Sequence, residues 1–314
     1  MRRHFVHFLW GSLLAILGLV FVFFISVWNG WVGYMPDMDE LSNPIDKFAS
    51  QVYSSDQQLI GTWNADNNNR VAIDYNGLSP HLVHALVATE DERFYEHSGV
   101  DFIALGRAVV KRGVMGQASA GGGSTITQQL AKQLFSEKAH STVERLLQKP
   151  IEWIIAVKLE RYFTKEEILA MYFNYFDFLH NAVGIKRAAN VYFNKEPRKL
   201  TVTESAMLVG LCKNPSMFNP LRHPERCLQR RNVVLMQMVK SGYVTKDEYK
   251  ELSQRPLGLH FTRSKPVSGA GDYFQAFLRQ YMMAKKPERE NYQSWQNRQF
   301  VLDSIAWEQD PLYG

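Results

Sequence analysis

A long apolar run opens the chain. No charged residue occurs between Phe8 and Met35, and residues 8–28 are almost wholly apolar. About 20 apolar residues span a bilayer core, so residues 1–35 predict a short cytoplasmic tip and one transmembrane helix. Arginines precede the run and acidic residues follow it, which predicts a cytoplasmic N-terminus. No small-x-small site closes the run, so we expect a retained anchor rather than a cleaved signal peptide.

Residues 36–78 combine a short linker with a β pattern. Strand-forming residues at 51–53 and 58–61 flank a polar turn, which predicts a small β-hairpin. A further short strand is expected at residues 71–75, after an asparagine-rich turn.

From Ser79 onward, apolar positions recur at helical spacing. Ser79 followed by Pro80 is typical of a helix start, and capping-box patterns follow at Thr164 and Thr201. Pro150 is expected to kink or restart the helix that contains it. The pattern predicts a mainly α domain over residues 79–260, with helices at 80–90, 102–115, 142–163, 164–175, 201–212 and 224–240. After it, residues 261–314 change character, and one further helix is expected at 269–285.

Composition and charge narrow the function classes. With 46% hydrophobic residues, the chain can bury a sizeable core, which excludes wholesale disorder. The formal net charge of +5 suits an anionic lipid surface or a phosphate-bearing ligand. No nucleic acid is expected as a partner, because no dense Lys/Arg stripe or nucleic-acid module occurs. Cys212 and Cys227 lie in apolar helical patterns, so we favour buried free thiols, while a disulfide stays open.

The densest chemistry lies in residues 90–99 and 121–132. The first segment gathers carboxylates, an aromatic ring and a histidine, and the second joins a glycine run to a helix start rich in hydroxyls and amides. Acid/base groups beside a flexible loop are typical of a transferase or hydrolase site. The glycine run lacks the Lys-Ser/Thr of a phosphate-binding P-loop, and no His-Glu-x-x-His zinc pattern occurs.

The same segments carry a family resemblance. Residues 90–99 read E-D-x-x-F-x-x-H-x-G, and residues 122–132 read G-G-S-T-I-T-Q-Q-x-x-K. Together they resemble the first two motifs of the family 51 peptidoglycan glycosyltransferases. That family comprises the transglycosylase domains of class A penicillin-binding proteins and the monofunctional transglycosylases. The resemblance covers roughly residues 45–260.

The resemblance implies a lysozyme-like helical fold that polymerises lipid II into β-1,4-linked glycan strands in bacterial cell-wall synthesis. Undecaprenyl diphosphate would leave with inversion, and Glu90 would be the general base for the acceptor hydroxyl. Asp91 and His97 would order the loop, with Phe94 packing beneath it. The substrate-binding residues it implies are Asp91, Phe94, His97, Thr125, Gln129, Lys132, Lys149 and Asn214.

The third family motif, Arg-Lys-x-x-Glu, is only partly matched. Lys149 and Glu152 are present, but Gln148 replaces the arginine, which removes one cationic contact to the donor diphosphate. Arg145, one helical turn earlier, is a candidate for compensation. The resemblance gives Glu152 a catalytic role in donor binding.

The fourth and fifth family motifs and the role given to Glu152 lead to three further expectations. In the fourth motif, Ala170 stands where glutamate is usual. In the fifth, Arg230 and Arg231 are expected to be a structural pair. No cofactor is obligatory, while a divalent cation, Mg²⁺ or Mn²⁺, held by Glu152 stays open.

The resemblance also implies partners and location. Lipid II, the growing glycan strand, the membrane, and cell-wall elongation or division proteins are the expected partners. The catalytic domain would lie outside the bacterial inner membrane, anchored by a single pass. Residues 261–314 resemble the connector that leads to a transpeptidase domain, but no Ser-x-x-Lys motif occurs, so no transpeptidase activity is expected from this chain.

Two alternatives stay open. One is a muramidase-like hydrolase, since two carboxylates in a helical fold can also cleave glycosidic bonds. The other is a non-catalytic cell-wall scaffold. The changes at Gln148 and Ala170 favour a scaffold, whereas the intact Glu90 and Glu152 argue against it.

Overall fold

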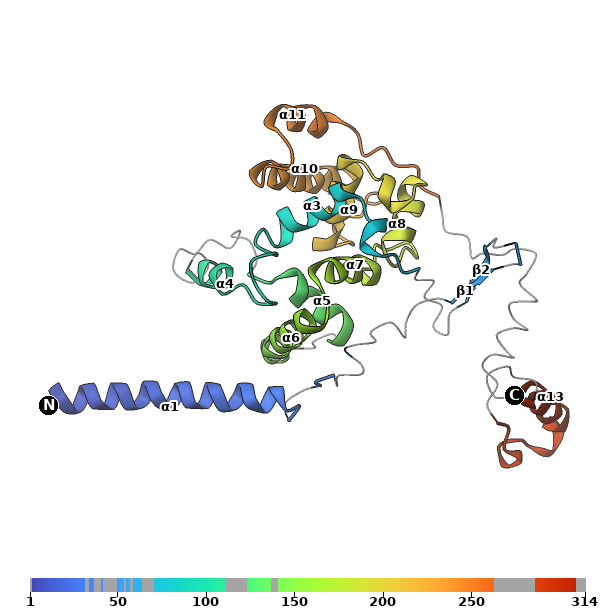
Figure 1. Ribbon diagram of the computed structural model, residues 1–314, viewed down its shortest axis with the longest axis horizontal. Helices are drawn as coiled ribbons and strands as arrows, with labels where there is room; N and C mark the ends of the chain where they lie inside the picture. The colour runs from blue at the N-terminus through green and yellow to red at the C-terminus, as the bar shows by residue number, and fades with distance from the viewer. Residues whose placement is uncertain are drawn as a thin grey trace. The chain divides into compact units, whose positions relative to one another are not determined.

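The chain divides into two units, each described here by itself. The computed structural model describes residues 2–31, 34–36, 41, 50–53, 55–56, 59–63, 71–110, 123–136, 141–262 and 286–308. The first unit contains Met1–Asp46 and Arg70–Arg263, and the second contains Lys47–Asn69 and Ser264–Gly314. Helices build the first unit (Figure 1). The expected mainly α class with a small β-hairpin is confirmed.

The helical order follows the predicted order closely. The first unit contains α1 (Arg2–Trp28), η1 (Tyr75–Gly77), α3 (Pro80–Glu90), α4 (Phe102–Val109), α5 (Ile126–Phe135), α6 (Thr142–Tyr162), α7 (Lys165–Tyr175), α8 (Ile185–Phe193), η3 (Pro197–Lys199), α9 (Val202–Lys213), α10 (Pro224–Lys240) and α11 (Lys246–Gln254). The second contains β1 (Ser50–Tyr53), β2 (Leu59–Trp63), η4 (Arg289–Asn291), η5 (Ser294–Gln296) and α13 (Asn297–Glu308).

Helix α9 forms the centre of the core. Its residues 204–211 are all buried, because most are small or apolar and the helix packs against both α3 and α10. The helix starts at the predicted capping box, in which the Thr201 and Glu204 side chains each bond the other residue's backbone N–H. Helices α5, α6 and α7 form a second group, in which α5 packs against both α6 and α7 (Figure 1).

Helix α3 carries the first candidate residue at its end. Pro80 occupies the first helical position, and the Ser79 hydroxyl donates to the Leu200 carbonyl at 2.9 Å instead of capping its own helix. Its buried apolar face packs against α9 and α10. The helix ends at Glu90, which therefore lies where a buried helix meets a loop.

The β prediction is half confirmed. Strands β1 and β2 pair antiparallel, as expected for a hairpin. The strand expected at 71–75 is wrong, since residues 71–74 have no regular structure and η1 follows. The Asn174 side chain takes the place of a partner strand: its Oδ1 accepts from the Ile73 N–H at 3.2 Å, and its Nδ2 donates to the Ile73 carbonyl at 2.8 Å.

Three helix predictions need correction or extend outside the described residues. Helix α6 does not restart at Pro150 but continues through it, because a proline removes one backbone donor while the neighbouring turns and tertiary packing remain. Helix α4 ends at Val109 with Val110 as its C-cap, and residues 111–115 of its predicted span lie outside the described residues. The helix expected at 269–285 lies outside the described residues.

Helix α1 is long and apolar enough to cross a membrane. Near its C-terminal end it contacts α6: the rings of Phe24 and Trp153 stack with centroids 6.4 Å apart. Lys158 and Arg161 lie over the Trp28 ring at 5.1 and 5.8 Å. These cation–π contacts join the end of the apolar helix to the basic side of α6.

Candidate active site

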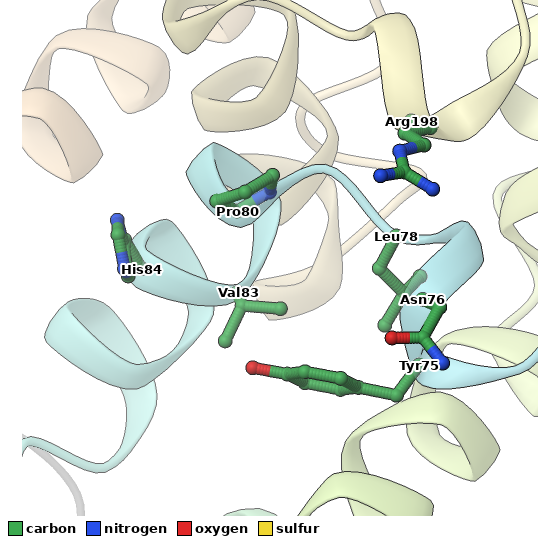
Figure 2. A pocket seen from close by; sticks show the side chains of 7 residues that line it. All are labelled: Tyr75, Asn76, Leu78, Pro80, Val83, His84 and Arg198. Carbon is green, nitrogen blue, oxygen red and sulfur yellow. The ribbon is translucent and has the colours of Figure 1, made fainter.

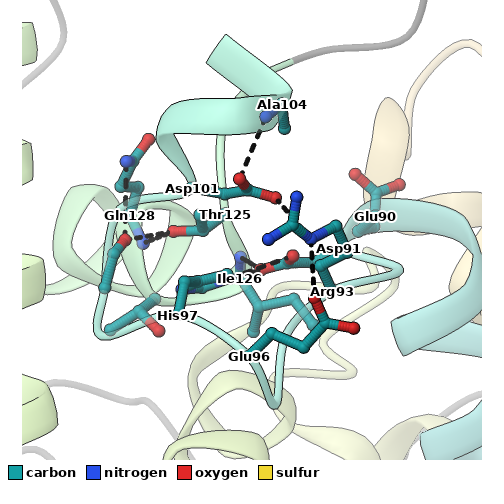
Figure 3. Close-up of polar contacts among 12 residues, drawn as sticks. Glu90, Asp91, Arg93, Glu96, His97, Asp101, Ala104, Thr125, Ile126 and Gln128 are labelled. Carbon is teal, nitrogen blue, oxygen red and sulfur yellow. Dashed lines mark hydrogen bonds and ion pairs between the residues drawn. The ribbon is translucent and has the colours of Figure 1, made fainter. Parts of the chain in front are cut away.

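One buried carboxylate holds the loop that follows α3. Asp91 Oδ2 lies 3.0 Å from His97 Nε2, and it also accepts the Ile126 backbone N–H at 3.0 Å (Figure 3). Ile126 is the first residue of α5. Asp91 therefore ties residues 90–99 to the start of the helix that carries the second motif.

A cation supports the underside of the same loop. Phe94 is fully buried, and the Lys165 ammonium lies 4.3 Å from its ring centroid. Lys165 also donates to the His97 carbonyl at 2.7 Å and pairs with Glu160 at 2.6 Å. Sequence reasoning did not assign Lys165 to the site, because its sequence position marks only the first turn of a helix.

Gly99 and Thr125 close the loop against the scaffold. The Thr125 hydroxyl donates to the Gly99 carbonyl at 2.6 Å and accepts the Gln128 N–H at 3.1 Å, as the N-cap of α5. Thr125 is 1% exposed. The structure thus places this predicted substrate-binding residue inside the scaffold, where its hydroxyl orders the loop.

We expect Gly99→Ala to destabilise the protein strongly. Gly99 has a φ of +94°, and a Cβ there would lie 2.8 Å from backbone atoms of Ala156 in α6. Backbone strain alone costs about 1–3 kcal/mol, and the helix backbone cannot move aside as a side chain can. Denaturant unfolding in detergent should show a loss of at least about 2 kcal/mol.

Gly242→Ala is the matched control for this substitution. Gly242 also has a positive φ, +77°, but nothing lies within 4 Å of a Cβ there. It should lose only the strain contribution. Equal losses in the two variants would contradict a steric role for Gly99.

Glu90 lies between a neutral and a charged partner. Gln129 Nε2 donates to Glu90 Oε2 at 3.0 Å, and Arg230 Nη2 lies 3.5 Å from Glu90 Oε1. The Glu90 and Arg230 side chains are 18% and 10% exposed. Tyr172 donates its hydroxyl to Gln129 Oε1 at 3.1 Å, which fixes the amide so that its N–H groups face Glu90. Burial raises the pKa of Tyr172, so the phenol remains a donor.

Arg230 is a second site residue that the sequence did not identify, since it was expected to be structural. Adjacent residues on a helix point about 100° apart, so Arg230 and Arg231 cannot share one environment. Arg231 is fully buried and donates to backbone carbonyls that include Arg255 and Ser253, in the structural role expected of it. The Arg230 stem instead packs beside Gly210, with its guanidinium toward Glu90.

A second cluster of charges forms around Glu152. This carboxylate is 1% exposed, with Arg145 Nη1 at 2.5 Å from Oε1 and Lys149 Nζ at 2.9 Å from Oε2. Lys149 also donates to Ser124 Oγ at 3.1 Å, just before α5. Loss of hydration and the charge of Arg145 lower the pKa of Lys132, the pull of Glu152 opposes this shift, and Lys149 adds to it. These charges therefore share one local field.

Helix α5 connects the two halves of the site. Gln129 contacts Glu90, and Lys132, three residues later, interacts with the cluster around Glu152. Residues three apart on a helix share one face and differ by about 4.5 Å along its axis. The arrangement therefore places a base candidate and a cationic surface at the two ends of one short stretch of helix.

The residues around Glu152 do not fit a divalent-cation site of their own. Both carboxylate oxygens of Glu152 contact cations, which leaves them poor metal ligands. Among the described residues, no group of three His, Cys, Asp or Glu side chains is placed to hold a metal.

Of three other residues singled out from the sequence, Asn214 and Cys227 lie elsewhere in the scaffold, whereas Cys212 lies close to Tyr172, Glu90 and Arg230. Asn214 is exposed after α9, and its Oδ1 accepts the Met217 N–H at 2.9 Å, so its side chain caps a turn. Cys212 and Cys227 are both free, as predicted, and burial raises the pKa of Cys227 to about 12. Cys227 is buried, whereas Cys212 is only half-buried.

A pocket of about 190 Å³ lies beside the start of α3 (Figure 2). Its lining comes from η1, the link from η1 to α3, α3 and η3, through Tyr75, Asn76, Leu78, Pro80, Val83, His84 and Arg198. The His84 ring stacks on Tyr243 at 4.2 Å, and burial together with His81 lowers its pKa, so the ring is neutral near pH 7. None of the lining residues belongs to the two motifs, so this pocket is separate from the candidate active site.

Comparisons with known proteins agree with the motifs. The Transglycosylase family model matches residues 56–239. Penicillin-binding protein 1A of Aquifex aeolicus is 37% identical over 279 residues, covering 88% of this chain and 36% of that protein. Penicillin-binding protein 1A of Escherichia coli is 36% identical, covering 79% and 28%, and penicillin-binding protein 1F of Bacillus subtilis is 34% identical, covering 86% and 35%.

A solved structure gives a more distant match. The crystal structure of penicillin-binding protein 1A from Haemophilus influenzae matches with a TM-score of 0.38 and 23% identity, over 78% of this chain and 26% of that one. The chain spans about a third of the length of the curated relatives it matches. The family model covers more than half of the chain, and the chain therefore belongs to the transglycosylase family.

Proposed function

We propose that this chain is a peptidoglycan glycosyltransferase that polymerises lipid II into β-1,4-linked glycan strands. The observation that carries the proposal is the pairing, across α5, of the Glu90 carboxylate with the cationic cluster at Lys132, Arg145 and Lys149. Glycosyl transfer from a lipid diphosphate needs both parts, a base for the acceptor and cations for the leaving group.

The acceptor half of the reaction is assigned to Glu90. Its carboxylate takes the proton from the 4-hydroxyl of the acceptor N-acetylglucosamine as that oxygen attacks the anomeric carbon of the lipid-linked donor. The carbon–oxygen bond to the diphosphate breaks on the opposite face, which inverts the configuration. Gln129 and Arg230 hold the carboxylate through one oxygen each, so it stays oriented toward the acceptor.

The leaving-group half is assigned to the cluster around Glu152. Lys132 and Lys149 stabilise the negative charge that develops on undecaprenyl diphosphate as it departs. Glu152 holds Arg145 and Lys149 in place and is a positioning residue here. A cation carried by the diphosphate itself belongs to the substrate, so activity should be measured with and without Mg²⁺.

The membrane contributes the lipid-linked substrate. We assign α1 as a single-pass anchor in the bacterial inner membrane, with the N-terminus cytoplasmic and the catalytic unit outside. Helix α4 exposes Phe102 and Ile103, at 73% and 64%, and we assign this face to the membrane interface. Residues 79–260 are then the transferase domain, with 36–78 as a linker and hairpin and 261–314 as a connector.

No specific observation favours the muramidase-like hydrolase or the non-catalytic scaffold. Ala170 is buried on α7, and its methyl group needs no polar partner there. Position 148 holds a glutamine instead of the motif's arginine, but Arg145 pairs with Glu152, so the cluster is still cationic. Both points weaken the scaffold hypothesis.

The test is direct. Detergent-solubilised protein is incubated with labelled lipid II, with and without Mg²⁺, and products are resolved on a gel. A ladder of long glycan chains supports the proposal. Soluble muropeptides released from purified cell wall would favour the hydrolase instead, and no product from folded protein would contradict catalysis.

Lys132 gives the reaction an alkaline limit. Its pKa is lowered, and an ammonium is charged only below its pKa, so kcat/KM should fall as pH rises through that value. The fall should come at lower pH than for an ordinary lysine. Lys132→Arg stays charged and should move the fall to higher pH. An unchanged alkaline limb in that variant would remove Lys132 as its source.

A further inference from the structure

We infer that Arg145 is the diphosphate-binding arginine of this chain, and that Gln148, at the motif's arginine position, orients it. The inference rests on the proposed function and deepens it. It assigns the anionic end of the donor to a residue outside the family motif. The binding group would be shifted by one helical turn along α6.

Two side chains, those of Glu152 and Gln148, fix the position of the Arg145 guanidinium. Its Nη1 lies 2.5 Å from Glu152 Oε1 and donates to Gln148 Oε1 at 3.1 Å. Residues 145, 148 and 152 follow the three- and four-residue spacing of one helix face. The glutamine therefore acts as an acceptor for the guanidinium, which a second arginine at position 148 could not do.

Part of the guanidinium can still reach a ligand. The Arg145 side chain is 33% exposed, although Glu152 beneath it is 1% exposed. Arginine offers five N–H donors in a planar fork. Nη1 makes the contacts to Glu152 Oε1 and Gln148 Oε1, and Nη2 makes one longer contact to Glu152 Oε2 at 3.4 Å. The remaining donors suit the oxygens of a phosphate, which arginine binds in two-pronged fashion.

The charge count also calls for an anion. Lys132, Arg145 and Lys149 contribute three positive charges, and Glu152 contributes one negative charge. Glu152 pairs with both Arg145 and Lys149 and offsets one of the three positive charges, which leaves an excess of two. A lipid diphosphate carries about two negative charges, which balances the excess of the cluster.

The experiment exchanges residues 145 and 148, so that an arginine returns to the motif position. Arg145→Gln should lower kcat/KM for lipid II by about 10- to 100-fold, since charge-assisted contacts to phosphate are strong. The exchange variant Arg145→Gln/Gln148→Arg should recover activity to within about fivefold, because it returns an arginine to the same helix face. Arg161→Gln, on the exposed far end of α6, is the control and should change kcat/KM by less than about twofold.

Binding of inorganic pyrophosphate gives a readout that does not depend on turnover. Calorimetric titration of the detergent-solubilised full chain should show weaker binding in Arg145→Gln and recovery in the exchange variant, with thermal unfolding checked in each. Unchanged pyrophosphate binding in folded Arg145→Gln would overturn the inference, as would an exchange variant that folds but does not recover. If the wild-type chain binds pyrophosphate through Arg145 but makes no glycan, the proposed function fails and this inference stands.

Discussion

Glu90→Gln should reduce lipid II polymerisation by about 10²- to 10⁴-fold, the range that a positioned general base supplies. The amide has nearly the same shape as the carboxylate, and its oxygen can still accept the hydrogen bond that Gln129 donates. It cannot take a proton from the acceptor hydroxyl. The variant should therefore fold normally and lose kcat, which single-turnover assays with labelled lipid II would measure.

Glu96→Gln is the control within the same loop. Glu96 is 65% exposed and pairs with Arg93 at 2.9 Å, away from Glu90 (Figure 3). An exposed ion pair contributes at most about 1 kcal/mol, so this variant should polymerise at close to the wild-type rate. Polymerisation that survives in Glu90→Gln at more than about a tenth of the wild-type rate would assign the base to another residue.

Substitution of the two adjacent arginines of α10 should affect different properties, the rate for Arg230 and the stability of the fold for Arg231. Arg230→Gln should lower kcat by about 10- to 100-fold with little change in KM, because Glu90 loses the cation that orients it. Its unfolding should remain close to that of the wild type. The Arg230 Nε–H is buried and has no hydrogen-bond partner within the described residues. The Nη2 contact to Glu90 Oε1 is long, at 3.5 Å, and Glu90 is 18% exposed, so water can replace it.

Arg231→Gln should instead destabilise the fold. Arg231 is fully buried, and it donates to the carbonyls of Leu252, Ser253, Arg255 and Pro256. A hydrogen bond from a charged donor contributes about 1.5–3 kcal/mol, so the loss should reach at least about 3 kcal/mol. Chemical denaturation and kcat measured on both variants test the pair. Partial recovery of kcat in Arg230→Lys would support an electrostatic role, and a loss of stability equal to that of Arg231→Gln would show that Arg230 is structural.

Local sequence determined the helices and their starts. The capping boxes at Thr164 and Thr201 form as predicted, because a cap needs only residues three apart in the chain. The apolar length of α1 is likewise a property of one segment. The motifs around Glu90 and Glu152 were recognisable for a related reason, since each motif is short and contiguous.

Only the tertiary structure decided which of these segments meet. Residues 71–75 carry a strand pattern, yet the side chain of Asn174, 101 positions beyond Ile73, satisfies that backbone instead. Arg230 reaches Glu90 across 140 positions, and no local pattern separates it from Arg231. Periodicity reports which face of a helix is buried, but not which distant group lies opposite that face. Ion pairs between such groups depend on the packing of α3, α9 and α10, and that packing is a property of the whole chain.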